Sequence, residues 1–117
     1  MGFFTFEKRE RITKRREFVN LNLHGKRCYA RSFAVISKQN GRDITRLGIS
    51  VGKKVGNPVK RNRIKRMIRE FFRHSKGQIP KGYDIMIVAL KKGDEFPFLK
   101  VQEELADLIL KNDALFS

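Results

Sequence analysis

One segment of the chain, residues 53–73, concentrates side chains that could bind phosphate groups. It holds nine Lys and Arg residues and one acid, Glu70. At about 100° per residue, a helix would gather the polar side chains of this segment on one face and the apolar ones on the other. The polar face consists of Asn62, Lys65, Arg66, Arg69 and Arg73. Because Lys and Arg form charge-assisted hydrogen bonds with phosphate oxygens, this face predicts polyanion binding.

The spacing of the charges supports the same interpretation. Solvated helices usually place Glu four residues from Lys or Arg, since each such pair gains a few tenths of a kcal/mol. Here Arg61, Lys65 and Arg69 follow one another at that spacing and repel each other. A solvated face is the alternative, but the self-repulsion favours a surface that a polyanion neutralises.

The sequence shows no cluster of residues that could cleave a phosphodiester unaided. Such a reaction usually needs carboxylates that hold metal ions, or a pair of His residues for proton transfer. His24 and His74 are far apart, and Cys28 has no evident His partner. The acids of residues 1–90 are isolated along the sequence: Glu7, Glu10, Glu17, Asp43, Glu70 and Asp84. We expect no protein active site and no cofactor bound by the protein alone, while the sequence leaves metal binding open.

The composition limits the class of protein. The 117 residues carry a net charge of +15, which points to nucleic acid or another anionic surface as partner. Residues 1–90 hold 23 Lys/Arg and six acids, net +17, whereas residues 91–117 hold four and six, net −2. A single Cys excludes an intramolecular disulfide, and no apolar run approaches the ~20 residues of a membrane span. We expect one cytoplasmic RNA-binding domain, residues 1–117, without a membrane or small-molecule partner.

Three helices are predicted. The basic helix spans residues 58–74, with Asn57 as its N-cap and Pro58 at the first helical position. A shorter helix over residues 14–24 would be capped by Thr13 and followed by Gly25 as its C′ residue. A last amphipathic helix runs from residue 96 to about residue 111.

The strands predict a small mixed sheet. Residues 32–37 and 46–51 read as an antiparallel hairpin, and an extended arm before them would lay Phe4 and Phe6 on the domain. Residues 83–90 are almost continuously apolar, as in a strand buried on both faces. We pair this strand parallel to a hairpin strand in a βαβ unit, which gives a two-layer α/β sandwich.

Two features leave alternatives open. Gly48, Ser50 and Gly52 share one side of a strand, which could be a loosely packed edge or could let a bulky ligand approach the backbone. Phe18 and Phe33 could belong to the core or could stack on unpaired bases.

Residues 46–73 resemble the signature of the bacterial ribonuclease P protein subunit. The shared pattern is Lys53-Lys54-Val55-Gly56-Asn57 followed, after three residues, by Arg61-Asn62-Arg63-Ile64-Lys65-Arg66. The resemblance implies a protein cofactor of a ribozyme whose RNA subunit carries the active site and removes the 5′ leader of precursor tRNA. It also implies an α/β sandwich with a left-handed βαβ crossover, and a need for Mg²⁺ in the RNA–protein holoenzyme.

The resemblance assigns residues to two RNA surfaces. Contacts with ribonuclease P RNA would come from Lys53, Lys54, Asn57, Lys60, Arg61, Asn62, Arg63, Lys65, Arg66 and Arg69. The cleft for the precursor tRNA leader would be lined by Arg11, Lys14, Phe18, Arg31, Phe33 and Ser50. The chain departs from the family pattern at Asn22, where a second aromatic is common, and at Leu90, where a basic residue is common. The alternative function is that of a ribosomal protein or general RNA chaperone without a catalytic complex.

Overall fold

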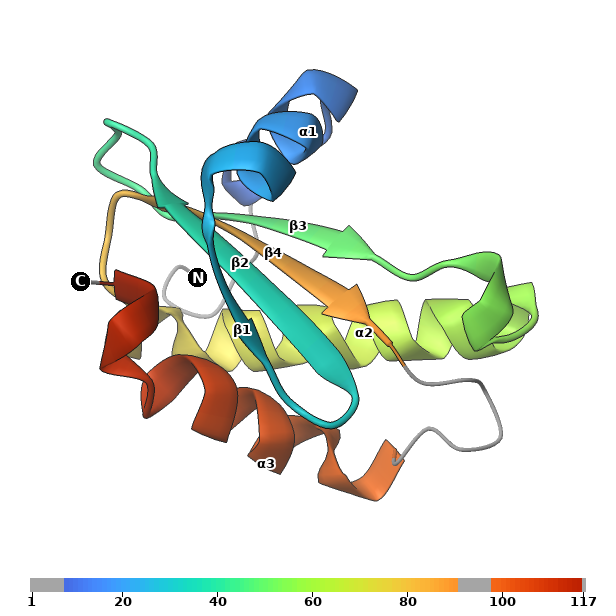
Figure 1. Ribbon diagram of the computed structural model, residues 1–117. Coiled ribbons are helices and arrows are strands. Elements are labelled where there is room, and N and C mark those ends of the chain that lie inside the picture. The colour runs from blue at the N-terminus through green and yellow to red at the C-terminus, as the bar shows by residue number, and fades with distance from the viewer. Residues whose placement is uncertain (1–7, 91–97, 117) are drawn as a thin grey trace.

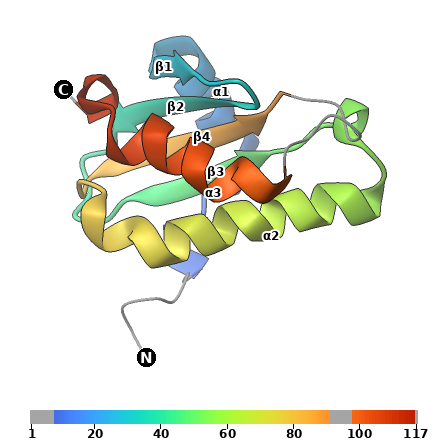
Figure 2. The ribbon, with the colours of Figure 1, turned by 90° about the horizontal axis from the view of Figure 1, so that it is seen from below.

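A computed structural model describes residues 8–90 and 98–116 of the chain. Four strands form one mixed sheet in the order β1-β2-β4-β3, with α2 and α3 on one face and α1 on the other (Figures 1 and 2). The helices are α1 (Arg15–His24), α2 (Pro58–Ser75) and α3 (Val101–Leu105), the last continued by a π-helical turn, Ala106–Leu110. The strands are β1 (Lys26–Tyr29), β2 (Phe33–Gln39), β3 (Arg46–Ser50) and β4 (Tyr83–Ala89).

The predicted hairpin between the second and third strands is wrong. β4 lies between β2 and β3, antiparallel to β2 and parallel to β3. β4 is the most apolar strand, and a hairpin between its neighbours would have left it at an edge of the sheet. The six residues from Asn40 to Thr45 can extend to about 20 Å, which is enough to step across one intervening strand.

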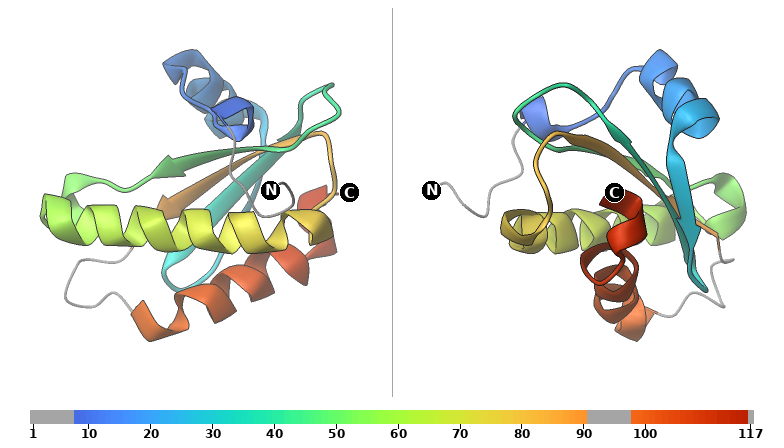
Figure 3. Two further views of the ribbon diagram at one scale, coloured as in Figure 1. Left: turned by 180° about the vertical axis from the view of Figure 1, so that it is seen from behind. Right: turned by 60° about the vertical axis from the view of Figure 1, so that its left-hand side comes forward.

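The predicted parallel βαβ unit is confirmed, with β3, α2 and β4 as its parts. In the left-hand view of Figure 3, α2 lies in front of the sheet while β3 and β4 both point to the left, β3 above β4. A crossover with this arrangement is left-handed, as the resemblance implied. The general preference for right-handed crossovers would have predicted the opposite hand.

α2 begins and packs as the sequence predicted and ends one residue later. The Asn57 side-chain oxygen accepts a hydrogen bond from the Lys60 backbone N–H at 2.9 Å, which confirms the N-cap. The buried face of the helix consists of Ile64, Ile68, Phe71, Phe72 and Ser75. With α3 it covers the main core, which includes Val35, Leu47, Ile85, Ile87, Val101 and Leu105.

α1 forms where it was expected, but its ends differ from the prediction. The N-cap is Lys14 rather than Thr13, and it makes no side-chain capping bond. Gly25 has a φ of −80°, so it is not a left-handed C′ residue. A Cβ at Gly25 would lie 2.5 Å from Ile36 Cγ2 and 2.7 Å from the Leu21 carbonyl oxygen, so close packing against β2 requires the glycine.

Three further elements complete the comparison with the sequence. β1 was not predicted from the sequence, because this strand has only four residues, begins with Lys26 and Arg27, and is mostly exposed. The C-terminal helix buries Val101, Leu105, Leu108 and Ile109, although its expected start at residue 96 lies outside the described residues. The proposed arm with Phe4 and Phe6 also lies outside them.

Candidate nucleic-acid interface

The first surface is the exposed side of α2 together with the turn before it. A 3₁₀ turn, Lys53–Val55, places Lys53 and Lys54 beside the start of α2, where both side chains are exposed. The predicted RNA-contacting residues lie on these two elements. Asn57, Asn62, Arg63, Arg66 and Arg69 are exposed, while Lys60, Arg61 and Lys65 are half-buried.

Some of these side chains also have structural partners. Arg61 Nε donates to the Gly56 carbonyl at 3.1 Å, and the Arg63 guanidinium lies 4.0 Å from the centre of the Phe98 ring. These contacts restrict the two arginines and hold Arg63 against the segment that leads into α3. Asn57 likewise serves as N-cap, so its loss would affect the helix as well as any ligand.

The middle of the α2 surface is cationic and uncompensated. Lys65, Arg66 and Arg69 form no ion pair within the described part of the chain. The single acid of the segment, Glu70, instead binds Arg73, with 2.6 Å between Glu70 Oε1 and Arg73 Nη2. This hydrogen bond holds the pKa of Glu70 below its ordinary value. The acid therefore neutralises the last turns of the helix, and Lys65, Arg66 and Arg69 remain available to an external anion.

The second surface is the sheet face on which α1 lies. The strand register places three rows of side chains across this face. The first row is Arg46, Asp84 and Lys38; the second is Gly48, Met86, Ile36 and Arg27; the third is Ser50, Val88, Ala34 and Tyr29. α1 covers the second row, with Leu21 packed against Ile36 and Met86. The first and third rows therefore lie on opposite sides of α1.

Phe18 packs against β3 and remains partly exposed. A Cβ at Gly48 would lie only 2.5 Å from Phe18 Cε1, so the ring itself occupies the space that the glycine provides. The bulky group that approaches the backbone at Gly48 is therefore Phe18 rather than a ligand. Ser50 and Gly52, farther along the chain, are exposed. Phe18 thus has a packing role and can still present part of its ring to a nucleotide.

The other predicted leader-binding residues separate into accessible and buried positions. Arg11, Lys14 and Arg31 are exposed, Arg11 beside β3 and Arg31 in the β1–β2 turn. Phe33 is fully buried in the core under α2 and α3, on the opposite face of the sheet from α1. The prediction that Phe33 lines the leader cleft is therefore wrong. Successive strand residues point to opposite faces, and Phe33 points to the closed one.

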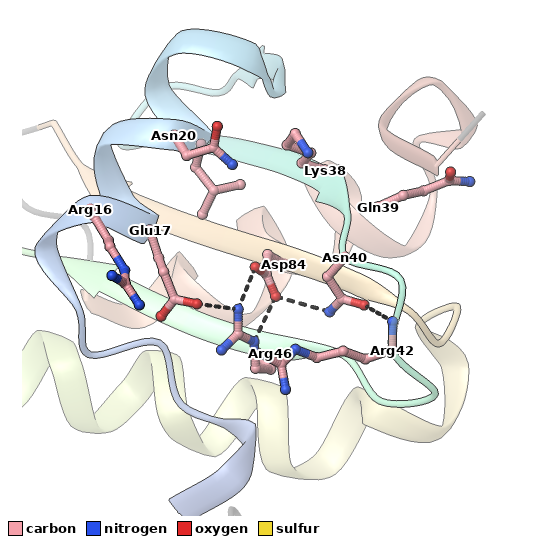
Figure 4. A pocket seen from close by; sticks show the side chains of 10 residues that line it. Arg16, Glu17, Asn20, Lys38, Gln39, Asn40, Arg42, Arg46 and Asp84 are labelled. Atoms are coloured by element: carbon pink, nitrogen blue, oxygen red, sulfur yellow. Dashed lines mark hydrogen bonds and ion pairs between the residues drawn. The ribbon is translucent and has the colours of Figure 1, made fainter.

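A buried ion cluster that the sequence analysis missed lies in the first row (Figure 4). Arg46 Nη2 lies 2.7 Å from Asp84 Oδ2 and 2.8 Å from Glu17 Oε2, while Arg46 Nε donates to Asp84 Oδ1 at 2.8 Å. Asn40 Nδ2 also donates to Asp84 Oδ1, at 2.9 Å. Asp84, and then Glu17, hold the pKa of Arg46 above its ordinary value although burial acts in the opposite direction.

Glu17 and Asp84 are therefore not isolated acids. Their pairing was recognisable in principle, because Asp84 is the one charge in an apolar strand and Arg46 begins the strand beside it. Glu10 is also paired, with 3.0 Å between its Oε2 atom and Lys76 Nζ. Among the described residues, no three His, Cys, Asp or Glu side chains are grouped so that they could hold a metal ion. Glu10, Glu17 and Asp84 thus form ion pairs within the fold.

Comparisons with known proteins agree with this geometry. The chain matches the ribonuclease P family over residues 6–113. The chain belongs to the ribonuclease P protein family. Members are components of ribonuclease P, an endoribonuclease of tRNA processing. The alternative of a ribosomal protein or general RNA chaperone receives no support from the comparisons.

Relatives and solved structures of the family cover nearly the whole chain. The ribonuclease P protein component of Syntrophus aciditrophicus is 44% identical over 111 residues, which are 95% of this chain and 93% of the relative. The RNase P protein of Staphylococcus aureus superposes with a TM-score of 0.82 at 38% identity, covering 92% of this chain and 98% of that one. The RNase P protein of Thermotoga maritima gives 0.78 at 39% identity, with coverages of 88% and 97%.

The mixed α/β fold is thus that of ribonuclease P proteins. Within the described residues, no helix has the length and apolar character needed to cross a membrane.

Proposed function

We propose that this ribonuclease P protein binds the catalytic RNA through α2 and the 5′ leader of precursor tRNA through the face around α1. The two surfaces lie on opposite sides of the sheet, so one protein can contact both RNAs at once (Figure 2). Its role is then to hold the substrate against the ribozyme. The observation that carries this proposal is the surface of α2, on which Lys65, Arg66 and Arg69 lack any acid partner in the described chain.

The α2 surface suits a folded RNA because its donors are charged and lie on a rigid helix. Contacts of this type go mainly to phosphates, which fix register and orientation without reading sequence. The release of condensed counterions then makes the affinity strongly dependent on salt. Asn62 lies among the cations and adds an amide that can both donate and accept.

The α1 face suits a single strand. Arg11, Lys14 and Arg31 supply exposed charge, and the accessible part of the Phe18 ring can stack on a base. Such stacking tolerates any sequence, as leaders of different tRNAs require. Ser50 lies at the end of β3, where it adds a hydroxyl without bulk.

Catalysis is assigned to the RNA subunit in this proposal. The described protein residues offer no metal-holding cluster, so the Mg²⁺ that the resemblance implies would be held by the RNA. No chemical step then passes through a protein side chain. The cytoplasm, where tRNA precursors are processed in bacteria, is the proposed location.

Reconstitution tests the proposal. The protein mixed with a bacterial ribonuclease P RNA should restore removal of the 5′ leader at a magnesium concentration at which the RNA alone is nearly inactive. The protein without RNA should leave precursor tRNA intact. Robust cleavage at the mature 5′ end by RNA-free protein would contradict the proposal.

A further inference from the structure

The side of α1 opposite to the third row contains a basic hollow. It has a volume of about 410 Å³ and lies over the first row of the sheet (Figure 4). Arg16 and Asn20 line it from α1, Lys38 and Gln39 from the end of β2, and Arg42 from the turn that follows. Its size falls in the range of about 300–1,000 Å³ that is usual for ligand sites.

The floor of this hollow is rigid and carries one net negative charge. Arg46 is bound by both Asp84 and Glu17, and Asn40 fixes Asp84 from the side. Arg46 neutralises only one of the two carboxylates, so the floor compensates one of the positive charges on the walls. Arg16, Lys38 and Arg42 form no ion pair with any residue of the described chain. Three cations on the walls thus face one net negative charge on the floor, and the hollow remains positive by two charges.

One further hollow continues this one along α1. A hollow of about 410 Å³ at the start of the helix is lined by Lys14, Arg15 and Arg16, and shares Arg16 with the first. A third hollow, of about 430 Å³, shares Lys38 and Gln39 with the first, but it turns around the end of β2 to Tyr83 and Leu115, which belong to the closed face of the sheet. The first hollow and the one at the start of the helix together follow α1 from Lys14 to Leu21.

We propose that a single-stranded segment of precursor tRNA runs along these two hollows, namely the part of the leader farther from the cleavage site than the part beside Phe18. This inference rests on the proposed function, which makes precursor tRNA the substrate of the α1 face. The hollow at the start of α1 includes Lys14, which lies one helical turn before Phe18. A strand that leaves the Phe18 side around the start of α1 therefore reaches it directly.

The shape and chemistry of the path favour a nucleotide strand over a small anion. Connected open hollows suit an extended ligand, and successive cations suit phosphates that recur along a chain. The amides of Asn20 and Gln39 can donate to and accept from base edges or ribose hydroxyls. The path also lies across the sheet from α2, so the catalytic RNA docked on α2 does not compete for it.

The test uses the reconstituted holoenzyme and two precursor tRNAs that differ only in leader length. One leader is long, and the other ends after the few nucleotides that the Phe18 side can hold. The variant is Lys38→Ala/Arg42→Ala, and the control is Lys100→Ala/Lys111→Ala, which removes the same formal charge from the exposed side of the C-terminal helical region, where Lys111 is paired with Asp107. For the unmodified holoenzyme, the variant and the control, the Kd of each of the two precursor tRNAs is measured over a series of salt concentrations.

We expect a loss that depends on leader length. Each phosphate contact with a single strand contributes about 0.7 to the slope of log K against log salt. Loss of two contacts should therefore flatten this slope by about 1.4 units for the long leader. The short leader and the control variant should show no change. Arg16→Ala, on the opposite wall of the hollow, should repeat the effect at about half this size.

Other outcomes overturn the inference. An equal loss with both leaders would place the contact on the tRNA body or the catalytic RNA, and no loss with either would mean that the cations are only solvated. Failure of the proposed function would look different, because the unmodified holoenzyme would then bind neither precursor more tightly than mature tRNA.

Discussion

Arginines at two places in this protein have opposite relations to acids. Arg46 lies under α1 with hydrogen bonds to two carboxylates, and its side chain is 10% exposed. Arg66 and Arg69 lie on α2 in solvent, with no acid bound to them in the described chain. The same side chain therefore stabilises the fold in one place and is available to a partner in the other.

Burial explains why a positive charge stabilises the fold in one place and is available to a partner in the other. A buried cation must be neutralised within the protein, because an unpaired charge in the interior is strongly destabilising. An exposed row of like charges is tolerated by the fold but gains nothing from it, so an external polyanion is the natural complement. Removing charges from the two places should accordingly produce opposite patterns of effects on stability and binding.

The largest effect is expected at Arg46. Arg46→Met leaves Asp84 and Glu17 without their cation, and should lower the free energy of unfolding by about 3–5 kcal/mol. Arg46→Lys retains the charge but loses the paired hydrogen bonds to Asp84, and should fall between wild type and Arg46→Met. Chemical denaturation of the three proteins checks this order. A loss below 1 kcal/mol in Arg46→Met would show that the cluster does not stabilise the fold.

Phe18 should show an intermediate effect on stability together with an effect on binding. Its ring is half-buried, so Phe18→Ala should lower the free energy of unfolding by about 2 kcal/mol, less than the 3–5 kcal/mol of a fully buried Phe. The exposed part of the ring predicts a loss of about 1–3 kcal/mol in affinity for precursor tRNA. Affinity of the holoenzyme for mature tRNA should stay unchanged.

Titrations with the two tRNAs separate these contributions. Phe33→Leu is a useful comparison, since Phe33 lies in the closed core and should change stability alone. Equal weakening for both tRNAs in Phe18→Ala would restrict Phe18 to packing.

A smaller effect is expected at the N-cap of α2. Asn57→Ala removes the acceptor for the Lys60 N–H and should destabilise the protein by about 1 kcal/mol. Asn57→Ser keeps an acceptor and should be nearly neutral. If both variants lose affinity for the catalytic RNA while only Asn57→Ala loses stability, the Asn57 side chain also contacts RNA. A stable Asn57→Ala protein would mean that the capping bond is of little importance.

The sequence was most informative where one element satisfied several rules together. In α2, the cap, the proline, the apolar face and the charged face all indicated the same helix, and the structure confirms its start and its packing. The strand at residues 83–89 was recognised from its apolar run. Its parallel partner followed from the order strand, helix, strand.

Long-range pairing was harder to predict from local pattern. The order β2-β4-β3 depends on which strand is buried most in the folded molecule. The sequence instead suggested a hairpin of β2 and β3, because these strands follow one another along the chain. The hand of the crossover came only from the family resemblance. Phe33 was misassigned because a shift of one residue along a strand moves a side chain to the other face. The Arg46 cluster joins residues 29 and 38 positions apart, which local pattern does not connect.

The account depends most directly on the α2 surface, and the salt dependence of binding to the catalytic RNA tests it. Arg66→Ala and Arg69→Ala should each change stability by less than about 0.5 kcal/mol. Each should flatten the slope of log K against log salt by about one unit, because each removes a phosphate contact. Arg73→Ala, in which the lost arginine was already bound by Glu70, should flatten it less. Slopes for Arg66→Ala and Arg69→Ala equal to that of the unmodified protein would contradict the account.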